Sequence, residues 1–153
     1  GGPVKAGSTF VATTVRRVPI EVFSTVTRPA FPDAATNFVM ALFPIPRDYD
    51  SGDITITLFR RKTAASANTV VMRTDLYRFR ASTAVLTIST GNNVNFSDNT
   101  ANSLQLDVVF AAANFALGDI IRVDLSRLGA DAGDTHVGDV EFDGGWVEYT
   151  GRL

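Results

Sequence analysis

The sequence predicts a single all-β domain, an antiparallel β-sandwich of the jelly-roll type with eight or nine strands and little or no helix. Short runs of β-branched and aromatic residues recur at spacings of roughly 8–15 residues, with turn-forming residues between them. No run has the apolar period of a long helix. The sole tryptophan, Trp146, lies near the end of a cysteine-free chain, so the Cys–Trp–Cys signature of an immunoglobulin domain is absent.

The first half of the chain is expected to form strands at residues 10–15, 18–26, 35–43 and 54–58. Pro19 restricts the second of these to a sheet edge or to its own first residues. The strand at 35–43 has apolar residues at both parities, which is typical of a strand covered on both faces. The stretch RDYDSGD that follows is expected to be a turn-rich loop.

The second half is expected to form strands at residues 69–80, 84–88, 104–110, 120–125 and 137–149. Residues 111–117 are the only candidate helix, of at most two turns. In the last strand the apolar residues change parity at Gly144 and Gly145, which predicts a β-bulge there. Residues 1–8 are expected to be a linker or the remnant of a tag, and residues 9–153 the domain itself.

Composition narrows the classes of protein to consider. The chain has 153 residues, a net charge of −2 and a pI near 5.3, which argues against a nucleic-acid partner. It has no cysteine for disulfides or thiolate metal sites, and no apolar run near the roughly 20 residues of a membrane-spanning helix. Eleven phenylalanines and a mean hydropathy of +0.11 predict that some apolar surface is buried against another subunit.

Catalytic chemistry is not expected. His136 is the only histidine, and the sequence predicts a solvated loop position for it, without a G-x-S-x-G stretch to supply a nucleophile. Glu141 and Glu148 are the obvious carboxylate pair for glycoside hydrolysis, and they are expected to be outward, solvated positions of one strand. No catalytic residue and no obligatory cofactor is therefore assigned.

A calcium site is the one metal hypothesis. Four carboxylates crowd the last loop and strand, and calcium accepts carboxylate and carbonyl oxygens in flexible geometry; they are Asp131, Asp134, Asp139 and Asp143. Their spacing is not that of an EF-hand loop, and aspartate is also an ordinary turn residue.

Carbohydrate binding is the other binding hypothesis, because an aromatic ring stacks on the apolar face of a sugar. The candidate residues are Tyr49, Phe96 and Trp146. Basic clusters are expected mainly at solvated strand edges, with recognition of acidic sugars as the alternative; they are Arg16–Arg17, Arg60–Arg61–Lys62 and Arg78 with Arg80.

Two stretches resemble domains of bacteriophage fibre and spike proteins: FPIPRDYDSGDITITLFRRKTAASANTVVMRTDLYRF and LGDIIRVDLSRLGADAGDTHVGDVEFDGGWVEY. The resemblance covers about residues 38–149. It implies a non-enzymatic jelly-roll head displayed on the virion surface, usually as a homotrimer that contacts other virion proteins. It carries over no binding residues.

The expected function is therefore a virion structural protein, a fibre, spike or decoration domain, that takes part in attachment to the host surface. A lectin-like module that binds host polysaccharide is the alternative, through loops such as 48–53, 91–102 and 130–136. A polysaccharide depolymerase is disfavoured, because no paired carboxylates are apparent.

Overall fold

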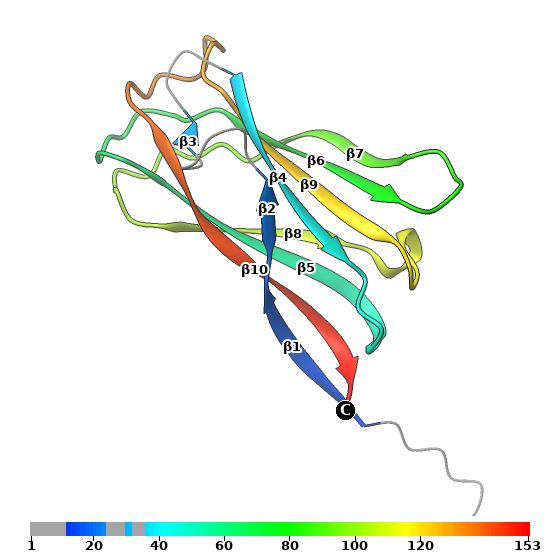
Figure 1. The fold of residues 1–153 in the computed structure, drawn as a ribbon. Helices are drawn as coiled ribbons and strands as arrows, with labels where there is room; N and C mark the ends of the chain where they lie inside the picture. Colours follow the sequence, from blue (N-terminus) through cyan, green and yellow to red (C-terminus); the bar gives the residue numbers. More distant parts are fainter. Residues whose placement is uncertain (1–11, 24–29, 32–35) are drawn as a thin grey trace, which may run out of the picture.

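The computed structural model describes residues 12–23, 30–31 and 36–153. The linker predicted at 1–8, residues 10–11 of the first predicted strand and residues 24–26 of the second lie outside this part. The described residues form ten strands and one 3₁₀ turn. The strands make two five-stranded antiparallel sheets, which confirms the predicted all-β sandwich (Figure 1).

The first sheet has the order β1-β10-β5-β8, with β3 also paired to β10. Its strands are β1 (Thr13–Pro19), β3 (Ala30–Phe31), β5 (Tyr49–Lys62), β8 (Leu104–Phe110) and β10 (Val140–Arg152). The second sheet has the order β2-β4-β9-β6-β7. Its strands are β2 (Glu21–Phe23), β4 (Thr36–Pro44), β6 (Met72–Phe79), β7 (Leu86–Asn93) and β9 (Ile120–Leu128).

The long strands pair in a nested order. Strand β1 pairs with β10, β4 with β9, β5 with β8, and β6 with β7. A long hairpin rolled into two layers gives this order, so the topology is compatible with a jelly roll. At one edge β1 runs on into β2 and thereby passes from one sheet to the other (Figure 1).

The core lies between the two sheets. It is built from the side chains that point inward from each long strand. Alternation places every second residue on the same face of a strand, so these side chains meet across the sandwich. The fully buried apolar members include Ile54, Ile56 and Leu58 of β5, Ile121, Val123 and Leu125 of β9, and Val140 and Val147 of β10. The turn η1 (Ala112–Asn114) agrees with the short helix allowed at 111–117.

Several predicted boundaries are wrong. Strand β5 begins at Tyr49, inside the predicted RDYDSGD loop, and β7 continues to Asn93, inside the loop predicted at 91–102. Polar residues on an outward or exposed strand look like loop residues in sequence, although their backbone continues the ladder. The strand predicted at 18–26 divides instead between β1 and β2.

The basic cluster at 60–62 is not at a solvated edge, because β5 lies between β10 and β8. Arg60 is 6% exposed and Lys62 is fully buried. The Lys62 ammonium donates hydrogen bonds to the carbonyls of Ser66, Asn68 and Asp98. Burial lowers the pKa of Lys62, and the nearby Asp98 carboxylate opposes this. These cations hold loops onto the end of the sandwich.

The predicted bulge in β10 is confirmed. The register with β5 shifts between Phe142 and Gly144, and Gly144 has φ of +101°. The shift changes which parity faces the core: Val140 and Phe142 point inward before it, and Val147 and Tyr149 after it. Trp146 therefore falls on the outer side. None of the helices within the described part of the chain is long and apolar enough to cross a membrane.

Candidate functional site

Trp146 lies on the outer face of the β1-β10-β5-β8 sheet. Its backbone pairs with Thr57 of β5 on one side and with Pro19 of β1 on the other. The indole is half-buried by neighbours on the same face and does not belong to the core. Gly145 next to it allows the close approach, since a Cβ there would lie 1.9 Å from the Thr57 carbonyl oxygen.

A second aromatic ring extends the surface. The Phe59 ring of β5 lies 5.0 Å from the Trp146 ring, centroid to centroid, with the planes tilted by 57°. The guanidinium carbon of Arg17 lies 5.1 Å from the indole centroid. Tilted ring pairs and cation–π contacts are favourable arrangements. Together the two rings form an apolar platform with a cation over part of it.

Hydrogen-bonding groups lie beside this platform. The Thr57 hydroxyl donates to the Asp107 carboxylate of β8 over 2.7 Å. The Gln105 amide donates to the two oxygens of the same carboxylate over 2.9 and 3.2 Å. Since Trp146, Thr57 and Asp107 pair across adjacent strands, Asp107 is about 10 Å from Trp146 along the sheet. We call this surface, with Arg17 and Phe59, the Trp146 face.

Charges on this outer face are mostly paired. Arg17 contacts Glu148 over 2.8 Å, and Arg61 contacts both Glu141 and Asp143, the latter over 3.0 Å. Hydrogen bonding to Asp143 raises the pKa of the Arg61 guanidinium. With Asp107 the face carries four carboxylates and two guanidinium groups, so its net charge is negative.

This arrangement suits a sugar ring. An aromatic platform offers an apolar surface for one face of a pyranose, and the exposed Asp107 carboxylate and Gln105 amide beside it can bond to sugar hydroxyls. The Thr57 hydroxyl is 3% exposed, and it holds Asp107 in place. Glu141 and Glu148 share the outer face because of the bulge, but seven strand residues separate them by about 20 Å. Glycosidase carboxylates stand about 5–10 Å apart, so this pair lacks that spacing.

The three aromatics predicted from sequence do not gather at one place. Phe96 is 7% exposed and packs in the core, with the Arg60 guanidinium 4.7 Å from its ring centroid. Tyr49 packs edge-on against Phe115 at 5.3 Å and donates its hydroxyl to the Gly52 carbonyl. Burial raises the pKa of this phenol, with Asp53 and then Asp50 adding to the effect. Only Trp146 lies on an open sheet face.

The four aspartates predicted as calcium ligands have separate roles. Asp134 forms a buried ion pair with Arg127, and Asp143 pairs with Arg61. Asp131 accepts the Gly133 N–H, and the Asp139 carbonyl accepts the Thr63 N–H. Within the described residues no three histidine, cysteine or carboxylate side chains are grouped to hold a metal. The calcium prediction gains no support from this arrangement.

The prediction that His136 is solvated is wrong, because this residue is only 2% exposed. Its loop folds over the end of the sandwich, where the Thr69 carbonyl accepts the backbone N–H groups of Thr135 and His136. Its Nδ1 lies 3.3 Å from the Ser66 hydroxyl. The Asp134 carboxylate nearby accepts bonds from Arg127 and from the Val71 N–H. This cluster ties loops together.

Phe59, Asp107 and Gln105 were not singled out from the sequence, and Arg17 was named only as part of a basic cluster, not beside Trp146. They lie on three strands far apart in the chain, and only the register joins them to Trp146. One signal was available: in the strand predicted at 54–58, Thr55 and Thr57 alternate with apolar residues, and extending it by one residue places Phe59 on the same face as Thr57.

Comparisons with known proteins add little. No protein-family model matches the sequence, and no curated protein matches it. Among solved structures, the chain is similar to TmCBM61, solved in complex with β-1,4-galactotriose. The two share 8% identity with a TM-score of 0.35, over 92% of this chain and 88% of that chain. A likeness of this degree carries no argument about function.

Proposed function

We propose that this protein is a non-enzymatic attachment module that binds a surface polysaccharide through the Trp146 face. The observation that carries the proposal is the Trp146–Phe59 platform, which lies outside the core beside the Thr57–Asp107–Gln105 hydrogen-bond cluster. An aromatic pair on a sheet face contributes nothing to the core, whereas it gives a sugar a surface to stack on.

The ligand of this face is a neutral glycan. Four carboxylates surround the platform, and the two guanidinium groups among them are already paired. A polyanionic sugar would meet net repulsion there, while neutral hydroxyls can donate to carboxylates such as Asp107. Arg17 is 63% exposed in its side chain, so it can swing aside and open the indole to a sugar ring.

Calorimetric titration with a panel of neutral and acidic oligosaccharides tests the proposal. We expect binding to a neutral member, weakened at least tenfold by Trp146→Ala, which corresponds to about 1.4 kcal/mol. Asp107→Ala should weaken the same ligand, because it removes an acceptor for sugar hydroxyls. Phe38→Ala, which removes an exposed ring from the other sheet, is the matched control and should leave the affinity for a free oligosaccharide unchanged.

Two results would contradict this proposal. One is equal affinity in the wild type and in Trp146→Ala, and the other is binding to acidic members alone. Circular dichroism of each variant shows whether the sandwich is intact.

We further propose that the module is displayed on a phage virion, where it attaches the particle to its host. The resemblance of two long stretches to phage fibre and spike domains supports this. Purified protein is expected to bind host cells and to reduce phage adsorption in competition, and the Trp146→Ala variant to do neither. Adsorption that excess wild-type protein leaves unchanged would count against a role in attachment.

A further inference from the structure

We propose that the outer face of the second sheet binds a second copy of this chain. We call it the Arg122 face, and it consists of the outward side chains of three adjacent strands. They are Phe38, Met40 and Leu42 of β4, Ile120, Arg122 and Asp124 of β9, and Arg73, Asp75, Tyr77 and Phe79 of β6. This surface is separate from the Trp146 face, which lies on the other sheet.

Much of the Arg122 face is apolar. Phe38 is 49% exposed and Ile120 is 36% exposed, and none of the apolar residues on the face belongs to the core. The sequence predicted that β4 would be covered on both faces. In the structure its inward residues Val39 and Ala41 are buried, while no other described strand lies over the outward ones. Apolar patches of this kind mark interaction surfaces.

The charges at the centre of the face are balanced. Arg122 stacks over Tyr77 at 4.6 Å and over Phe79 at 5.0 Å, and it contacts Asp124 over 3.0 Å. Arg73 contacts Asp75 over 3.6 Å. Two guanidinium groups and two carboxylates give no net charge, so a copy of the face can approach it without repulsion. The Trp146 face, with its surplus of carboxylates, would repel its own copy.

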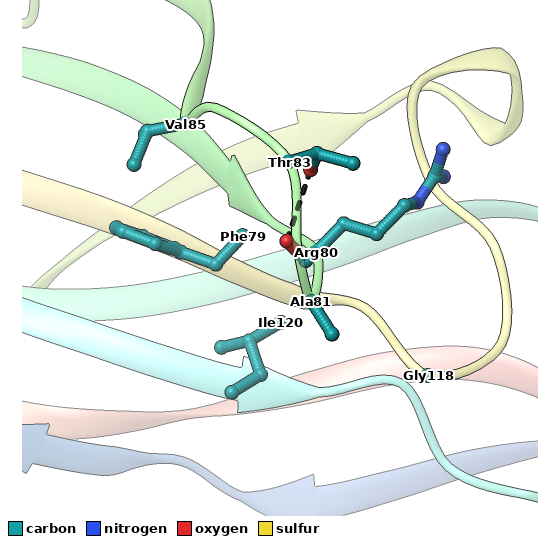
Figure 2. A pocket seen from close by; sticks show the side chains of 7 residues that line it. All are labelled: Phe79, Arg80, Ala81, Thr83, Val85, Gly118 and Ile120. Carbon is teal, nitrogen blue, oxygen red and sulfur yellow. Dashed lines mark hydrogen bonds between the residues drawn. The ribbon is translucent and has the colours of Figure 1, made fainter.

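A hollow of about 340 Å³ opens at one end of the Arg122 face. Phe79, Ala81, Val85 and Ile120 supply its apolar lining (Figure 2). The Arg80 side chain points away from these residues, and its guanidinium binds both oxygens of the buried Asp119 over 2.7 Å. The hollow is therefore suited to an apolar side chain.

Phe38 lies at the other end of the same face. It pairs with Ser126, six residues along β9 from Ile120, which places it about 20 Å from the hollow. Two copies can face each other through this surface, related by a two-fold axis that lies in the plane between them. This rotation places the Phe38 end of one copy opposite the hollow of the other. Each Phe38 then meets the hollow of the other copy, and both contacts form at once, as an isologous interface requires. The proposed assembly is a dimer, whereas the sequence predicted a trimer. The mass of the particle distinguishes the two.

Light scattering coupled to gel filtration measures that mass. We expect the wild type to give twice 16.4 kDa, and Ile120→Glu or Phe38→Glu to give 16.4 kDa, because a buried carboxylate opposes association. Val109→Glu is the matched control: Val109 is 53% exposed on the other sheet, so this variant should stay paired. A 16.4 kDa wild type at 100 µM, a particle of three copies, or an unchanged mass for both Ile120→Glu and Phe38→Glu would overturn the proposal.

Disulfide trapping supplies a second test that does not depend on charge. Since the chain has no cysteine, any disulfide in the double variant Phe38→Cys with Val85→Cys joins two introduced residues. The two positions are at opposite ends of one face, too far apart for a bond within a chain. Oxidation is expected to give a covalent dimer, whereas Phe38→Cys with Val109→Cys should stay monomeric on a denaturing gel. Equal cross-linking in the two double variants would overturn the arrangement.

Discussion

Asp134 and Arg127 form the ion pair on which the end of the sandwich depends. Both side chains are fully buried, and Arg127 also donates to the carbonyls of Phe31, His136 and Gly138. Asp134→Asn would remove the negative charge that accepts two hydrogen bonds from this buried guanidinium. We expect a loss of about 3–5 kcal/mol in the free energy of unfolding, measured by urea titration. Asp143→Asn, which breaks a more exposed pair with Arg61, should cost under about 1 kcal/mol.

The same pair predicts a pH dependence. Burial raises the pKa of Asp134, but hydrogen bonds from Arg127 and the Val71 N–H outweigh it, and the pKa lies below the usual 3.8. The folded state therefore binds this proton less tightly than the unfolded state. The stability from Asp134 is complete above pH 3.8 and is lost as the pH falls through the lower folded-state value. Asp134→Asn should flatten this acid limb, and an unchanged slope would contradict the assignment.

Individual residues were predictable from sequence only where local pattern decides their environment. The bulge in β10 was predicted from a change of parity, and it turns Trp146 outward, but Trp146 itself was named only as one of several aromatic candidates. His136 was placed wrongly, because nothing in a loop sequence shows that the loop folds back over the sandwich. Arg60 and Lys62 were placed wrongly, because a basic run looks solvated until its strand is known to be central.

At the scale of elements, β10 and β5 approach so closely at Gly145 that a larger side chain there should lower stability. A Cβ at Gly145 would lie 1.9 Å from the Thr57 carbonyl oxygen, so Gly145→Ala must push the two strands apart. We expect a loss of about 2–3 kcal/mol in thermal or urea unfolding. Because the displaced strands carry Trp146 and Thr57, the affinity for the glycan should fall as well.

Gly133→Ala is the control for this substitution. The nearest atom to its added Cβ is an Asp131 carboxylate oxygen at 3.1 Å, at the end of a side chain that can rotate away. We expect it to change the free energy of unfolding by less than about 1 kcal/mol. Equal losses in the two variants would show that strand contact is not the cause.

The strands themselves were largely predictable, because alternation reports burial on one face directly. Alternation within a strand does not show the register, that is, which residues of neighbouring strands lie side by side. The platform of Trp146 and Phe59, and the cluster of Thr57 with Asp107, depend on β10, β5 and β8 lying side by side. Residues 57, 107 and 146 share no local pattern that would join them.

At the scale of the whole molecule, the two proposed surfaces lie on opposite sides of one sandwich. Pairing through the Arg122 face would stack four sheets and leave the two Trp146 faces pointing in opposite directions. With sheets about 10 Å apart, the two glycan sites would be about 30 Å apart, back to back. Such a pair cannot place both sites on one flat surface, so it gains no avidity there.

This geometry predicts that the pair bridges separate surfaces. Wild-type protein should agglutinate beads coated with the neutral glycan that it binds, as followed by turbidity. Ile120→Glu should bind a free oligosaccharide with unchanged affinity but fail to agglutinate, because each particle then carries one site. Trp146→Ala should fail in both assays while keeping the mass of the pair. Agglutination by a monomeric Ile120→Glu variant would show that bridging does not depend on the Arg122 face.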